Sequence, residues 1–111
     1  MKKPSGKKGD ELKAVTPALC DYTDRILYDE VWERPGLSTR DRCLITVAAL
    51  VALYRPEQLP SHLGFALDNG VTKEELGEAI THLAFYASWP NAVTASRKLL
   101  ELVEAREKKD V

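Results

Sequence analysis

Apolar residues recur at helical spacing through most of this chain, starting near residue 16. Thr16 followed by Pro17 predicts a helix start, with Thr16 as the N-cap and Pro17 at the first helical position. Apolar side chains then follow every three or four residues until the Arg-Pro-Gly sequence at 34–36 ends the pattern. The apolar positions of this first predicted helix are Leu19, Tyr22, Ile26, Leu27 and Val31.

Two further helices are predicted on either side of a proline-rich corner. The sequence STRD at residues 38–41 has the outline of a capping box, with Asp in the place of Glu, and predicts a second helix that runs to about Tyr54. The third helix begins at Pro56 or Pro60, because a proline deep inside a helix lacks a hydrogen-bond donor and clashes with the preceding turn. Gly70 then supplies the residue type that commonly follows a helix.

The last two predicted helices complete an all-α pattern. TKEE at residues 72–75 is a full capping box, and Pro90 begins a fifth helix that frays after Arg106. Their expected core positions are Leu76, Ala79, Ile80, Leu83, Ala84, Ala87, Ala92, Val93, Leu99, Leu100 and Val103. No alternating β-branched run and no hairpin turn are found. The predicted fold is a small all-α bundle of about five helices.

The second helix is unusual because its apolar residues cover all of its sides. CLITVAALVALY, at residues 43–54, contains Thr46 as its only clearly polar member. A helix that is apolar all round requires burial all round, and a small domain struggles to surround one completely. The helix is therefore either central within the domain or covered by a second subunit, and we favour a homo-oligomer.

Charge divides the chain unevenly, although the 111 residues have a net charge of only −1. Five lysines and two acidic residues lie within residues 1–13, a composition typical of a flexible basic tail. The expected organisation is this tail, a single helical domain over residues 14–106, and a frayed end over residues 107–111. Because no basic stripe continues into the folded part, nucleic acid is not an expected partner.

The same composition bears on the cellular location. The N-terminal lysines precede no apolar run, so no signal peptide is expected. The apolar block at residues 43–54 is too short to span a bilayer, so no membrane association is expected. Cys20 and Cys43 form neither a CxxC motif nor a disulfide framework, which favours a reducing cytoplasm.

Motifs for metals and cofactors are missing from the sequence. The two histidines have no HxxxH, HxH or CxxC pairing, so no metal is expected. The glycines form neither a GxGxxG fingerprint nor a P-loop, and no GxSxG elbow is present. We therefore expect a protein without a cofactor.

The proline-rich corner contains the most suggestive side chains. His62 follows Arg55 and Glu57, a combination suited to acid–base chemistry on a bound acid. Arg42 and Arg55 flank the apolar block, and arginine binds carboxylates through two parallel hydrogen bonds. The alternative for His62 is a structural histidine bound to a backbone carbonyl at an interface.

A second set of candidates lies on the fourth helix and just after it. Glu78, His82 and Tyr86 share one helix face at a spacing of four residues. This face is either an acid–base pair with a phenol or a polar outer face. Trp89 lies at the corner between two helices, where it is a plug in the core or at an interface rather than a platform for a substrate.

Several segments together resemble a known family. RPGLSTRDR, LYRPEQL, H…ALDNGVTKEE and FYASWPNA occur in this order over about residues 28–100, and their order and spacing resemble the carboxymuconolactone decarboxylase family. That family is related to alkylhydroperoxidase D-like proteins. The resemblance implies an alkylhydroperoxidase D-like helical bundle that assembles as a homo-oligomer, often a trimer or a hexamer.

The wider family includes two chemistries. Its peroxidase branch has a CxxC motif followed four residues later by a histidine, and His62 matches that histidine. The two cysteine positions fall on Arg55 and Gln58, so the redox dithiol is missing. Because a disulfide cycle requires a second thiol within reach, peroxidase activity of this type is disfavoured.

The decarboxylase branch is more similar to this chain, and it acts without a cofactor on a lactone that carries carboxylates. The resemblance implies that Arg42, Arg55 and His62 line the catalytic pocket, with Arg55 binding a carboxylate and His62 donating a proton or a hydrogen bond. Decarboxylases of the family typically have an arginine where this chain has Gly64, and a glutamine is common at the position of His82.

Three functions follow in order of preference. The first is decarboxylation, or related lyase or isomerase chemistry, on a small carboxylated lactone or similar acid, as in aromatic catabolism. The expected catalytic residues are His62, Arg55 and Arg42, and the expected substrate contacts are Glu57, His82, Tyr86 and Trp89. The alternatives are a peroxiredoxin-type antioxidant activity and a non-catalytic oligomer that binds ligands.

Overall fold

The structure is a computed structural model that describes residues 11–109, and every regular element among them is helical. The elements in chain order are the short 3₁₀ helix η1 (Leu12–Ala14), α2 (Pro17–Tyr22), the π-helix η2 (Thr23–Val31), α3 (Thr39–Ala52), α4 (Leu59–Asp68), α5 (Lys73–Tyr86) and α6 (Trp89–Lys109). The prediction of an all-α fold is confirmed, and each of the five predicted helices is present. The first of them is α2 continued by η2.

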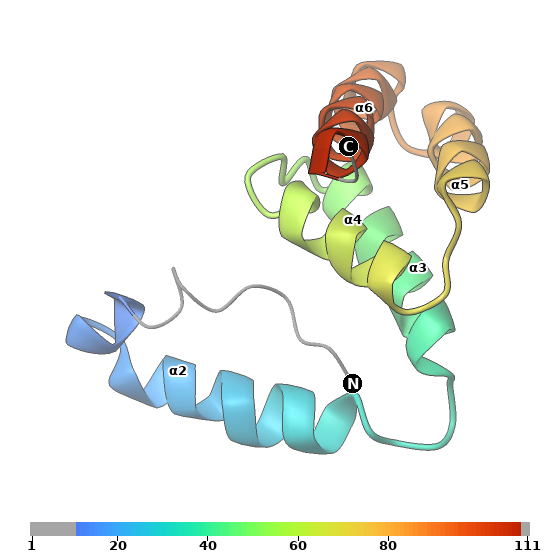
Figure 1. Cartoon of the computed structure of the whole chain (residues 1–111). Helices are drawn as coiled ribbons and strands as arrows, with labels where there is room; N and C mark the ends of the chain where they lie inside the picture. The colour runs from blue at the N-terminus through green and yellow to red at the C-terminus, as the bar shows by residue number, and fades with distance from the viewer. Residues whose placement is uncertain (1–10, 110–111) are drawn as a thin grey trace.

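The helical segment at residues 17–31, here called the arm, projects from the side of the other helices (Figure 1). Pro17 occupies its first turn as predicted, but Thr16 does not act as a side-chain cap, because its hydroxyl donates to the Leu12 carbonyl oxygen at 3.1 Å. From Thr23 to Val31 the arm continues as a π-helix, which the sequence pattern does not predict. Its wider turn is visible in the hydrogen bond from the Trp32 N–H to the Leu27 carbonyl oxygen, at 2.9 Å.

Two aromatic residues attach the arm to the remaining helices. Tyr28 and Trp32 are buried and stack on each other at 6.1 Å between ring centroids. Trp32 also stacks on Phe65 of α4 at 5.1 Å. All five members of the apolar stripe predicted for this helix are exposed in the single chain. They are Leu19, Tyr22, Ile26, Leu27 and Val31.

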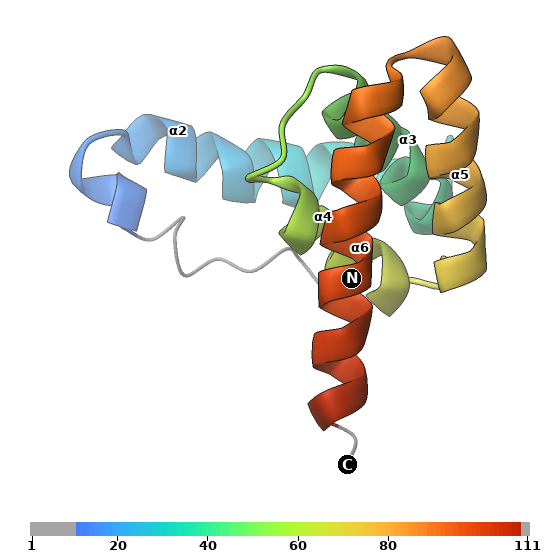
Figure 2. The same ribbon diagram turned by 90° about the horizontal axis from the view of Figure 1, so that it is seen from above.

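The core lies among the four helices that follow the arm. The helices α4 and α5 both pack against α3 and α6, and Figures 1 and 2 show α6 lying over α4 and beside α5. The side chains with essentially no exposed surface are Val47, Val51, Leu59, Leu63, Val71 and Leu76. Burial of these aliphatic groups is the main force that holds together the four helices α3 to α6, here called the body.

The apolar helix α3 is only partly covered within one chain. Its buried residues are Cys43, Val47 and Val51, at a spacing of four residues that defines one face. On other faces Ile45 remains 56% exposed and Leu53, just past the helix end, 63% exposed. The single chain therefore leaves uncovered part of the surface that the sequence predicts to be buried.

Helix ends follow the predicted caps closely. The Ser38 hydroxyl accepts from the Asp41 N–H at 3.0 Å, and Thr72 and Glu75 form a reciprocal capping box. The regular part of α4 begins at Leu59 with Pro60 in its first turn, which matches the later of the two predicted starts. Gly70 follows α4 with φ 98°, the left-handed conformation expected of that position.

Several predicted boundaries and core positions require correction. Residues 12 and 13 of the predicted tail belong to η1, whereas residues 1–10 of that tail lie outside the described residues. Helix α6 begins at Trp89, one residue before Pro90, because the Ser88 hydroxyl accepts from the Asn91 N–H at 3.3 Å and acts as the cap. Helix α6 also continues to Lys109, so residues 107–109 of the predicted frayed end are helical in the structure, and residues 110–111 are outside the described range. The predicted core residues that are instead exposed are Ala87, Val93 and Leu100.

Candidate active site

His62 lies on α4 at the junction between the arm and the body. Its ring is half-buried and lies 6.5 Å from the Phe65 ring, which in turn stacks on Trp32 of the segment that ends the arm. Burial lowers the pKa of His62 below its ordinary value of 6.5, because desolvation disfavours the charged imidazolium. At neutral pH the ring is therefore neutral, with one N–H donor and one nitrogen acceptor.

Arg55 is exposed and folds back on the end of α3. Its Nη1 donates to the carbonyl oxygen of Leu53 at 2.6 Å and to that of Tyr54 at 3.2 Å. These carbonyls belong to the negative end of the helix dipole, so the cation stabilises the end of α3. The Nε and Nη2 donors of Arg55 are not used in these contacts and are available to an anion.

Arg42 connects the first turn of α3 to the loop before it. Its Nη2 donates to the Arg34 carbonyl oxygen at 3.0 Å. Its Nε is buried and has no hydrogen-bond partner among the described residues. A buried N–H group of a cation without a partner is costly, and it is a donor that an incoming carboxylate could satisfy.

Glu57 lies in the turn between α3 and α4 and is exposed. Within residues 11–109 it forms no ion pair with Arg55 or with any other cation. The three residues of the predicted acid–base combination, Arg55, Glu57 and His62, are therefore close in sequence, but no hydrogen bond joins their side chains.

The remaining candidates, on α5 and at the start of α6, form a separate group. His82 and Tyr86 are both exposed and stack on each other with ring centroids 4.7 Å apart. Trp89 is 59% exposed and meets the Phe85 ring edge-on at 5.4 Å, so its predicted alternative as a core residue is wrong. Helix α5 packs against α3 and α6 rather than against α4, and no ring contact joins this group to His62 among residues 11–109.

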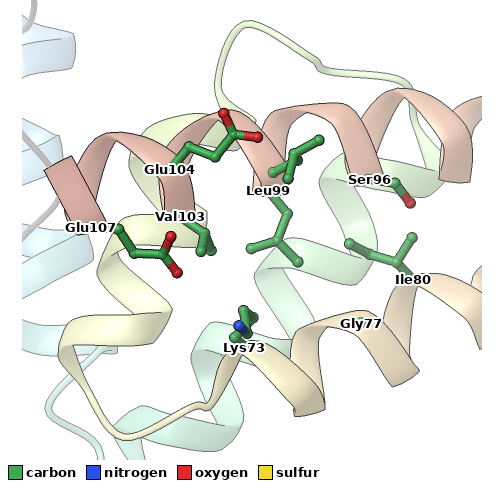
Figure 3. Close-up of a pocket in the computed structure, with 9 residues that line it drawn as sticks. Lys73, Gly77, Ile80, Ser96, Leu99, Val103, Glu104 and Glu107 are labelled. Carbon is green, nitrogen blue, oxygen red and sulfur yellow. The ribbon is translucent and has the colours of Figure 1, made fainter.

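A groove of about 320 Å³ lies between α5 and α6, away from most of the predicted site residues. Figure 3 shows Lys73 and Gly77 on its α5 side and Leu99, Val103 and Glu107 on its α6 side. A smaller hollow of about 150 Å³ continues from it past Ile80 and includes Trp89. None of His62, Arg42 and Arg55 lines either of these cavities.

Sequence reasoning missed one set of contacts next to the candidate site. Arg106 of α6 donates from Nη1 to Asp68 at 3.0 Å and from Nη2 to the Gly64 carbonyl oxygen at 3.2 Å. Gly64 is two residues from His62, and the resemblance leads us to expect an arginine there. In the structure, the guanidinium of Arg106 lies against this part of α4 instead. Arg106 is about 40 residues away in sequence, so no local pattern can indicate this contact.

The described part of the chain has neither a metal-binding cluster nor a helix that could span a membrane. Residues 11–109 contain no group of three or more His, Cys, Asp and Glu side chains placed to hold a metal ion. Within the same range, no helix combines the length and the apolar character needed to cross a membrane.

The class of protein follows from the match of this helical chain to a family model. The chain belongs to the carboxymuconolactone decarboxylase family, whose model matches residues 17–101. This confirms the resemblance drawn from the sequence, and the matched range contains all seven predicted site residues.

Two relatives illustrate the chemistry found in proteins similar to this chain. The 4-carboxymuconolactone decarboxylase of Acinetobacter baylyi is 46% identical over 70 residues, which is 63% of this chain and 52% of the relative. The nitrosuccinic acid decarboxylase of Metarhizium robertsii is 37% identical over 65 residues, which is 59% of this chain and 46% of the relative. The chain thus spans about half the length of the curated relatives it matches.

Proposed function

We propose that this protein is a cofactor-free decarboxylase of small acids that carry at least two carboxylates. The observation that carries this proposal is its similarity to two relatives that are both named as decarboxylases. Their two named substrates differ in structure, so the shared element is the loss of carbon dioxide rather than one substrate. Related lyase or isomerase chemistry on a carboxylated lactone remains within the same proposal.

The two named acids have a common electronic feature. Nitrosuccinic acid has a carboxylate next to a nitro group, and carboxymuconolactone has carboxylates on an unsaturated lactone. When the bond to the departing carboxylate breaks, its electron pair moves into the electron-withdrawing group, and a proton then adds to carbon. The protein must therefore hold the remaining carboxylate, stabilise the developing charge and supply the proton.

In the proposed site the two arginines hold carboxylates and His62 handles the proton. Arg55 has Nε and Nη2 left for an acid, and Arg42 has a buried Nε without a partner. His62 is neutral in the ligand-free protein, so it first donates a hydrogen bond. A bound carboxylate nearby raises the pKa of the imidazole, which allows it to take up a proton and deliver it to carbon.

We assign the remaining predicted substrate contacts to a site that a second copy of the chain completes. The expected homo-oligomer is a trimer or a hexamer. Phe85 and Tyr86 are 73% and 80% exposed, and such aromatic side chains are typical of interfaces. His82, Tyr86 and Trp89 of one copy would then lie near His62 and Glu57 of another. If Phe85→Glu leaves the mass measured by sedimentation unchanged from wild type, this surface is not an interface.

The antioxidant alternative has less support than decarboxylation. Cys43 is buried, and burial raises the pKa of its thiol to about 11, which keeps it protonated and a poor nucleophile. Neither Cys20 nor Cys43 forms a disulfide. We retain a cytoplasmic location in the proposal because it suits a protein with two reduced thiols.

The direct test is release of carbon dioxide from 4-carboxymuconolactone and from nitrosuccinic acid, with a chelator present. We expect turnover of at least one acid by the wild-type protein, and a loss of about 10²-fold in His62→Gln. Glu33→Gln, a change of an exposed acid outside the site, is the matched control and should retain full activity. If the wild-type protein binds the acids, as seen by a thermal shift, and releases no carbon dioxide, it is the non-catalytic ligand-binding alternative instead.

A further inference from the structure

Just past the end of helix α3, Tyr54 has a backbone conformation that tyrosine rarely adopts. Tyr54 has φ 56°, and it is the only residue other than glycine with positive φ among residues 11–109. Its N–H donates to the Val51 carbonyl oxygen at 3.2 Å, and the Arg55 N–H donates to that of Leu50 at 2.8 Å. This is the Schellman pattern of a helix end, whose left-handed position usually belongs to glycine.

Helix α4 provides an internal comparison. It ends with a matching bond from the Val71 N–H to the Ala66 carbonyl oxygen at 3.0 Å, and Gly70 occupies the left-handed position. The chain therefore uses glycine at one of two equivalent helix ends and tyrosine at the other. After α3, the left-handed conformation brings Cβ of Tyr54 too close to the following carbonyl oxygen, and the backbone is strained there.

Contacts of the Tyr54 side chain within the structure do not offset this strain. The residue is 54% exposed, and its phenol has no hydrogen bond and its ring no ring contact with residues 11–109. Because more than half of the residue is exposed and these polar and ring partners are missing among residues 11–109, stability alone does not explain the tyrosine. Strained residues that the fold does not require are typical of functional positions.

The corner that holds Tyr54 is fixed from two directions. Arg55 Nη1 donates to the Leu53 and Tyr54 carbonyl oxygens, and the Asn91 side-chain amide of α6 donates to the Val51 and Ala52 carbonyl oxygens at 3.0 and 3.3 Å. The backbone of Tyr54 is thus held in place, and its carbonyl oxygen lies 3.2 Å from the guanidinium of the next residue, Arg55.

We propose that Tyr54 selects the substrate of the decarboxylase site, its ring contacting the planar unsaturated part of an acid whose carboxylate Arg55 binds. This rests on the proposed function, which assigns the carboxylate to Arg55. A planar lactone can lie against the phenol ring, whereas the flexible chain of nitrosuccinic acid offers no comparable flat surface. Tyr54 therefore favours flat, conjugated acids over aliphatic ones.

The central experiment compares Tyr54→Gly with wild type for thermal stability and for KM with both acids. Glycine removes the strain, so we expect the melting temperature to rise by about 4 °C. We expect KM for 4-carboxymuconolactone to rise by about fivefold and KM for nitrosuccinic acid to change little, because only the flat acid loses a ring contact. Tyr54→Phe retains the ring and should behave as wild type in both measurements.

Tyr22→Ala is the matched control, because Tyr22 is 52% exposed and lies on the arm outside the site. It should leave both KM values unchanged. A Tyr54→Gly protein that is no more stable than wild type, or that is more stable with KM unchanged for both acids, overturns the proposal. A change of oligomer mass without a change of KM also overturns it and assigns the ring to an interface.

Failure of the proposed function gives a different result from failure of this inference. If wild type turns over neither acid, the decarboxylase assignment fails, and calorimetric binding of 4-carboxymuconolactone to wild type and to Tyr54→Gly then decides the role of the ring. Equal affinity overturns the inference, and binding that is weaker by about fivefold in Tyr54→Gly supports it.

Discussion

The guanidinium of Arg106 lies against the backbone of Gly64, with Nη2 donating to the Gly64 carbonyl oxygen at 3.2 Å. A Cβ placed on Gly64 would lie only 3.1 Å from that nitrogen. The small residue on α4 and the arginine on α6 therefore depend on each other. Because the guanidinium also pairs with Asp68, its position is held from two sides.

This dependence predicts that replacements at Gly64 and Arg106 have non-additive effects on the free energy of unfolding. In wild type, Gly64→Ala gains helix propensity but displaces the guanidinium, so its net effect on the free energy of unfolding should be near zero. In an Arg106→Ala background the same change should stabilise the protein by about 0.5–1 kcal/mol. Urea denaturation of both single variants and the double variant measures this coupling.

Gly77→Ala is the control for that cycle, because a Cβ on Gly77 meets nothing within 4 Å. It should stabilise the protein by about 0.5–1 kcal/mol in either background. If Gly64→Ala is as stabilising as Gly77→Ala in wild type, the guanidinium does not restrict position 64.

His62 should make stability depend on pH below neutrality. Burial lowers its pKa in the folded protein, so the unfolded chain binds the proton more readily. The contribution of this group is fully present above its unfolded pKa, and it is lost as the pH falls through that value toward the folded pKa. Urea unfolding between about pH 5 and pH 7 should show stability falling with acid, and part of that slope should vanish in His62→Gln.

A proton NMR titration of His62 gives an independent measurement. The ring should titrate below 6.5 in the ligand-free protein, and a bound dicarboxylate should move the midpoint upward. A midpoint above 6.5 without ligand would contradict the burial argument.

The helix ends were predictable because their signals are local. Ser38, Thr72 and Gly70 are adjacent in sequence to the groups they cap, so a window of four residues is enough to identify them. The family was recognisable for a similar reason, since the order of short segments over residues 28–100 is retained in the sequence itself.

Other features depend on contacts that sequence spacing does not encode. The contact between Gly64 and Arg106 joins positions 42 residues apart, and the strain at Tyr54 arises from a hydrogen-bond pattern rather than from a residue motif. The grouping of site residues was also not predictable, because His62 is on α4 and His82 is on α5, and these helices pack against α3 and α6 rather than against each other. Helical periodicity indicates the face of each residue but not which helix lies opposite.

Gly70 should be the least replaceable of the glycines between helices. Its φ of 98° is strained for any residue with a side chain, so Gly70→Ala should destabilise the protein by about 1 kcal/mol or more. Gly70→Asn should lose less, because asparagine tolerates the left-handed region better than alanine. Thermal unfolding of the two variants distinguishes backbone strain from simple loss of a small residue, since strain alone predicts this order.

The two cysteines should differ sharply in reactivity. Cys43 is 2% exposed and the pKa of its thiol is about 11, whereas Cys20 is half-exposed on the arm. A thiol reagent at neutral pH should therefore modify one cysteine in the native protein and both after unfolding in urea. Cys43→Ser should also destabilise the protein by about 1–3 kcal/mol, because it buries a hydroxyl among apolar side chains, while Cys20→Ser should change stability by less than about 0.5 kcal/mol. Modification of native Cys43 as fast as Cys20 would show that the thiol is accessible, and the antioxidant alternative would then regain support.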